Sequence, residues 1–138
     1  MDIVDIAVEA IKEAGLIAPK QIVRDRFTDR VKTTSLLVAE TESKYNDAFS
    51  SPSEYGIYDS TLQIVAVSDQ RNPGEAQRLC REATETVIRR FDQMTVPYTG
   101  PVHGVRRIGK EQGTPEDTNC SDSYASIRTI LVIHQFEP

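Results

Sequence analysis

Hydrophobic residues recur along this chain with two different periods. A period of about 3.6 residues predicts amphipathic helices over Asp2–Ala14 and Pro73–Phe91. Short runs rich in β-branched residues predict strands, which are Gln21–Phe27, Ser35–Thr41, Ile57–Val67, Val102–Ile108 and Tyr124–Phe136. This order predicts an α+β fold, with a mixed or mainly antiparallel sheet of about five strands and two helices packed on one face.

Three of the predicted strands contain runs that place apolar residues on both faces of the strand. These runs are Leu36–Ala39, Leu62–Val67 and Ile130–Ile133. Side chains alternate between the two faces of a strand, so such runs need cover above and below the sheet. Two helices are roughly enough for one face. The pattern therefore predicts that the second face is covered by another copy or another protein.

The start of the second helix follows the residue preferences of helix N-termini. Asn72 is a favourable N-cap, Pro73 stands at the first helical position, and Glu75 follows three residues after the cap, as in a capping box. The apolar stripe that follows predicts a structural helix with one buried face.

The polar stretch from Glu42 to Tyr55 indicates a long loop or the extended tip of a hairpin. Tyr45, Tyr55 and Tyr58 lie in it or beside it. One interpretation is a solvated loop whose rings lie on the body of the protein. The other is a contact with a second protein, because tyrosine is enriched where protein surfaces meet.

The composition favours one soluble domain spanning residues 1–138. The formal net charge of -5 disfavours a dedicated nucleic-acid binder, since basic clusters supply most non-specific affinity for phosphates. The acidic N-terminal helix does not resemble a secretion signal, and no apolar run approaches the roughly 20 residues that span a bilayer. We expect no membrane partner and a cytosolic location where the protein is made.

Two groups of charged residues are candidates for an interface. Arg24 and Arg26 belong to a basic stretch that would form one stripe if its strand ran unbroken. The stripe is either a solvated edge that blocks unwanted pairing or a seam of ion pairs to an acidic loop of the next subunit. That loop would be Glu111–Asp122, which contains Glu116 and Asp117. Arg106 and Arg107 are adjacent, so they project to opposite faces and suit an edge strand.

Candidate chemistry is sparse. His103 and His134 are the only histidines and Cys80 and Cys120 the only cysteines, with no metal-ligand spacing among them. We expect a surface or interface location for such strand histidines, two free thiols rather than a disulfide, and no catalytic, metal or cofactor site. The alternative is a small α+β enzyme with a pocket that combines Cys120 and Asp122 with one of the histidines.

The middle of the chain resembles the tail terminator proteins of long-tailed bacteriophages. The resemblance rests on Leu62–Val67, a strand of the "LQI-V" type, followed by Arg71–Ala76 and an amphipathic helix with repeated alanines. The later strands, the N-terminal helix and the length also fit, so nearly the whole chain is covered by patterns of residue class. One departure is that many relatives carry an arginine near the end of the central strand, where this chain has Ala66–Ser68.

The resemblance implies a non-enzymatic virion protein. Such proteins form a ring, typically a hexamer, that caps the head-proximal end of the tail tube, stops its polymerisation and docks the head-tail connector or head-completion protein. DNA would pass only transiently through the lumen, and the location would be the tail or neck of the virion, after assembly in the host cytoplasm. A neck or head-completion connector is the alternative. The expected interface residues are Arg24, Arg26, Tyr45, Tyr55, Tyr58, Arg106, Arg107, Glu116 and Asp117.

Overall fold

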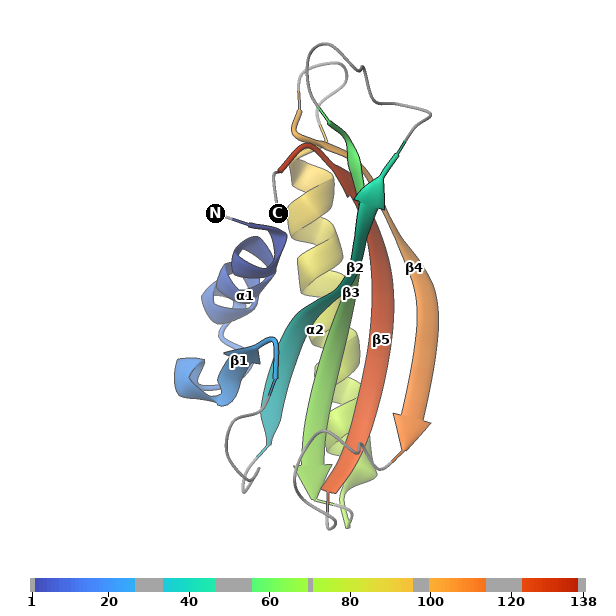
Figure 1. The fold of residues 1–138 in the computed structure, drawn as a ribbon. Coiled ribbons are helices and arrows are strands. Elements are labelled where there is room, and N and C mark those ends of the chain that lie inside the picture. The colour runs from blue at the N-terminus through green and yellow to red at the C-terminus, as the bar shows by residue number, and fades with distance from the viewer. Residues whose placement is uncertain are drawn as a thin grey trace.

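The computed structural model describes residues 2–26, 34–46, 56–69, 71–95, 100–113 and 123–136 (Figure 1). The helices are α1 (Ile3–Ala14), a 3-10 turn η1 (Pro19–Gln21) and α2 (Pro73–Gln93). The strands are β1 (Ile22–Arg24), β2 (Ser35–Tyr45), β3 (Tyr58–Asp69), β4 (Val102–Gly113) and β5 (Ser123–His134). Within this part of the chain no helix is both long enough and apolar enough to cross a bilayer.

The five strands form one mixed sheet in the order β1-β2-β3-β5-β4. β1 pairs with β2 in parallel, and every other neighbouring pair is antiparallel. β3 and β4 therefore run in the same direction with β5 between them, and α2 connects them across one face. This arrangement confirms the predicted α+β class and the mixed sheet.

Both helices pack on the same face of the sheet, as Figure 1 shows. The apolar stripe of α1 and residues such as Leu79 and Phe91 of α2 meet the inward residues of the central strands in one continuous core. At the start of α1, Asp2 and Asp5 form a capping box, and Gly15 ends the helix at a φ of 67°, which glycine adopts without strain.

The start of α2 differs from the prediction. The helix begins at Pro73 as expected, but the Asn72 side chain accepts no hydrogen bond from the helix, so no capping box forms. Instead, the Asn72 Nδ2 donates to Glu75 Oε2 at 3.2 Å, and Thr34 Oγ1 donates to Glu75 Oε1 at 2.8 Å. Glu75 is thus occupied by two side chains, one of which belongs to the segment just before β2.

The lengths of the first two strands also correct the prediction. β1 ends at Arg24 because Asp25 takes a φ of 71°, in the left-handed region, and turns the chain out of the sheet. β2 continues to Tyr45, through a bulge between Glu40 and Glu42, so the beginning of the predicted loop is strand. The prediction of one strand over Gln21–Phe27 is therefore wrong. Phe27 lies outside the described residues.

The second face of the sheet is also apolar, but one chain already buries part of it. Leu37, Val65, Val67 and Ala125 form a second cluster and are at most 7% exposed, although no helix in the described ranges lies on this face. The expectation that another copy must cover this face is wrong for these four residues. Farther along β5, Leu131 and Ile133 remain partly exposed.

Candidate functional site

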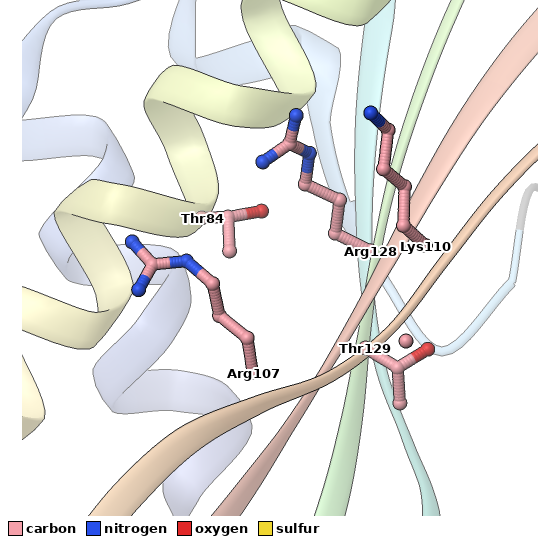
Figure 2. Close-up of a pocket in the computed structure, with 6 residues that line it drawn as sticks. Thr84, Arg107, Lys110, Arg128 and Thr129 are labelled. Atoms are coloured by element: carbon pink, nitrogen blue, oxygen red, sulfur yellow. The ribbon is translucent and has the colours of Figure 1, made fainter.

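Three cationic side chains gather at the β4 edge of the sheet. Arg107 and Lys110 come from β4, and Arg128 comes from the neighbouring strand β5. With Thr84 of α2, Gly109 and Thr129, they line an open cavity of about 300 Å³. Figure 2 shows the side chains of Arg107 and Arg128 extending from the strands toward α2. Two neighbouring strands thus place three positive charges around a cavity that α2 also lines.

A β-bulge brings the three cations to the same face. Residues three apart on a regular strand point to opposite faces. In β4 the register shifts between Arg107 and Gly109, so Arg107 lies opposite Ile130 and Lys110 lies opposite Arg128. Ile130 is fully buried under the helices, so both β4 cations lie on the helix-covered face.

The electrostatics of this cation cluster are unbalanced. Lys110 and Arg128 are directly paired across the strands, an arrangement in which like charges destabilise the sheet. Arg128 Nε is buried without a hydrogen-bond partner. None of the three cations forms an ion pair with a carboxylate of the described chain, whereas Arg24, Arg71, Arg78 and Arg90 all do. The arrangement is suited to binding an anionic group.

Arg24 is predicted to face another subunit, but its side chain binds carboxylates of its own chain. Its guanidinium donates to Asp2 Oδ2 at 3.0 Å, to Asp25 Oδ2 at 3.1 Å and to the Asp5 carboxylate. The hydrogen bond to Asp2 and then that to Asp25 raise the pKa of Arg24 above its ordinary value. Arg26 is exposed but lies beyond the end of β1. Among the described residues, Arg24 and Arg26 therefore form no basic stripe at this edge.

A row of rings crosses the end of the sheet where β2, β3 and β5 meet. Tyr45 and Tyr58 have ring centroids 5.0 Å apart, Tyr58 and His134 are separated by 5.9 Å, and His134 and Phe136 by 5.8 Å. Tyr45 is 59% exposed at the outer end of the row. Two of the predicted tyrosines are thus adjacent, and Tyr45 offers an accessible ring.

His134 is buried rather than at the surface, contrary to the prediction. It is 2% exposed, and burial lowers its pKa to about 4 against the opposing effect of Asp59. His103 is exposed, with its Nε2 2.7 Å from Gln135 Nε2. The two histidines therefore have unlike environments.

The residues of the alternative enzyme pocket are not assembled in the described ranges. Cys120 and Asp122 lie outside them, and Cys80 is a buried free thiol whose pKa burial raises. Its Sγ donates to the Ile64 carbonyl at 3.2 Å. Within these ranges, histidine, cysteine and acidic side chains form no group that could hold a metal ion.

The remaining predicted interface residues fall into two groups. Arg106 and Arg107 lie opposite Leu131 and Ile130, so they project to opposite faces of an edge strand, as predicted. Tyr55, Glu116 and Asp117 lie outside the described residues.

Sequence reasoning missed Lys110 and Arg128. The bulge that turns Lys110 toward Arg107 leaves no clear sequence signal. Arg128 does have a sequence signal, because it is the single charged residue within the apolar strand Tyr124–His134. A charge in such a strand needs a partner or a water-filled recess.

Comparisons with known proteins support the fold at low sequence identity. No protein-family model matches the chain, and no curated protein matches it. Among solved structures, a chain described as "Virion of native gene transfer agent (GTA) particle" is similar, with a TM-score of 0.61 and 11% sequence identity. The alignment covers 94% of this chain and 94% of that chain.

Proposed function

We propose that this chain is a non-enzymatic structural protein of a phage-like virion. The observation that carries the proposal is the similarity in fold to a chain of a gene transfer agent virion, which extends over 94% of both chains. A match of that coverage extends over nearly the whole fold rather than over one common motif. The sequence resemblance to tail terminators favours the same class independently.

Within that class we propose the tail terminator role. Copies of the chain would form a closed ring, expected to be a hexamer, on the head-proximal end of the tail tube, in the tail or neck region of the virion. The ring would stop tube growth and present a surface to the head connector. The open sheet edges and the uncompensated cation cluster support assembly into such a ring, since both lack partners among the described residues.

The experiment is an elongation assay with the tube protein of the same particle. Tube protein is polymerised with and without this chain, and tube lengths are measured by electron microscopy. The terminator role is supported if the tubes are shorter and do not elongate when fresh tube protein is added. Tubes of unchanged length, together with binding to the head connector alone, support a neck or head-completion protein instead.

A further inference from the structure

The sheet has two edges that lack a neighbouring strand in the described part of the chain. β4 forms one edge along its whole length. On the other side, β1 pairs only with Leu36–Val38 of β2, so β2 from Ala39 to Tyr45 is open. Strands of this kind can pair with a strand of another chain.

The two open edges are related by one row of residues across the sheet. Glu40 of β2 lies opposite Leu62, Leu62 lies opposite Ile130, and Ile130 lies opposite Arg107 of β4. Directly paired residues share a face, and Leu62 and Ile130 both point into the helix-covered core. Glu40 and Arg107 are therefore at the same level and on the same face, at opposite edges.

These edges carry opposite and uncompensated charges. At the β4 edge, Arg107, Lys110 and Arg128 have no carboxylate partner among the described residues, and Arg128 Nε is buried without a hydrogen bond. At the β2 edge, the side chain of Glu40 forms no hydrogen bond or ion pair within the described ranges. A cation cluster beside an open cavity and a free carboxylate thus occupy matching positions.

We infer that the cation cluster of one copy receives Glu40 of the next, so that copies join head to tail through the β4 edge and the open part of β2. The strand directions permit this contact, because β2 and β4 run antiparallel within one sheet. The contact is heterologous, and repetition of such a contact forms a closed ring when the rotation between neighbouring copies divides a full turn evenly. The inference rests on the proposed function, for which it supplies the contact between subunits.

A second copy fits this site better than a nucleic acid does. The chain has a formal charge of -5, so its approach to a phosphate backbone is disfavoured. A second copy supplies a carboxylate at the required level and face, and it also removes the like-charge repulsion between Lys110 and Arg128.

The test is a charge swap across the contact. Self-association is measured by sedimentation and by the concentration dependence of amide NMR shifts, from micromolar to millimolar protein at low salt. We expect shifts at residues 39–42 and 107–110 together. Arg107→Glu and Glu40→Arg should each weaken association by about tenfold or more, and the double variant should recover most of it.

Arg81→Glu is the matched control. Arg81 is an exposed arginine on α2, outside the cavity, and its reversal should leave association unchanged. Circular dichroism of each variant separates loss of contact from loss of fold. A wild-type chain without concentration-dependent shifts, or a double variant as weak as the single variants, overturns the inference.

Three further outcomes separate this inference from competing accounts. Loss of duplex DNA binding in Arg107→Glu with unchanged self-association assigns the cluster to nucleic acid and overturns it. If Arg107→Glu stops tube growth as well as the wild type does, the subunit contact is wrong while the terminator proposal stands. If the charge swap restores association but the chain never stops tube growth, the terminator proposal is the one that fails.

Discussion

Ser60 Oγ and His134 Nε2 lie 2.7 Å apart in the buried interior between β3 and β5. The backbone N–H of Phe136 donates to His134 Nδ1 at 3.0 Å, so Nδ1 is an acceptor and the proton of the neutral ring is on Nε2. Nε2–H then donates to Ser60, whose hydroxyl donates to Ser43 Oγ at 3.3 Å. The hydrogen bonds thus define one tautomer of a neutral histidine.

This arrangement predicts acid sensitivity. The pKa of His134 falls from 6.5 to about 4 on folding, so between these values the unfolded chain binds a proton that the native chain does not. The contribution to stability is therefore complete above about pH 6.5 and is lost as the pH falls through that window. It amounts to at most about 3 kcal/mol. Urea unfolding at a series of pH values measures it.

The control for this pH dependence is the second histidine. His134→Gln should flatten the slope of unfolding free energy between pH 6.5 and 4, whatever its effect on overall stability. His103→Gln, at an exposed position, should keep the slope. Equal slopes in the wild type and His134→Gln would show that another group is responsible.

Arg24→Met should destabilise the attachment of α1 to β1. The variant keeps the apolar stem but removes the charge that binds Asp2 and Asp5 of α1. The group is about two-fifths exposed, so we expect a loss of about 1 kcal/mol, reduced further at high salt. Chemical denaturation at two salt concentrations measures it. Arg81→Met is the matched control, and an equal loss in both variants would contradict the assignment.

Leu79→Ala should cost about 2 to 5 kcal/mol, because Leu79 is 1% exposed at the centre of the interface between α2 and the sheet. Leu79→Asp should prevent folding, since a lone carboxylate there is not solvated. Thermal unfolding followed by circular dichroism measures both effects. A native-like transition in Leu79→Asp would mean that this helix face is accessible to water.

Cys80 should be unreactive in the native state. It is fully buried, burial raises its pKa, and its thiol donates to the Ile64 carbonyl. In a Cys120→Ser variant, an aromatic disulfide reagent should label Cys80 only at the rate of unfolding. Rapid labelling in native buffer would show that α2 opens locally far more often than its burial indicates.

Periodicity was sufficient to predict both helices and the succession of helices and strands along the chain, because one helix face and the strand cores follow regular spacings. It failed where a contact distant in sequence decides the outcome. The spacing predicted that Glu75 completes a capping box, but its carboxylate accepts hydrogen bonds from the side chains of Thr34 and Asn72 instead. Residues 42–45 fell in the stretch predicted as a long loop or an extended hairpin tip, because their pairing with residues 58–61 of β3 is not evident from either segment alone.

The candidate interface shows the same division. Simple alternation predicted that Arg106 and Arg107 point to opposite faces of an edge strand, and the register of β4 confirms these directions. Arg24 was predicted to lie in an interface because its partners Asp2 and Asp5 lie about twenty residues earlier, too far along the sequence for the ion pairs to be predicted. Lys110 was missed because the bulge reverses its direction relative to regular alternation.

We propose that several copies of this chain form one ring on the end of a tail tube. The most direct measurement is electron microscopy of tubes assembled with gold-labelled protein. We expect label at one end only of each finished tube, and loss of that label in the Arg107→Glu variant. Label along the whole tube, or tubes that end without any label, would contradict it.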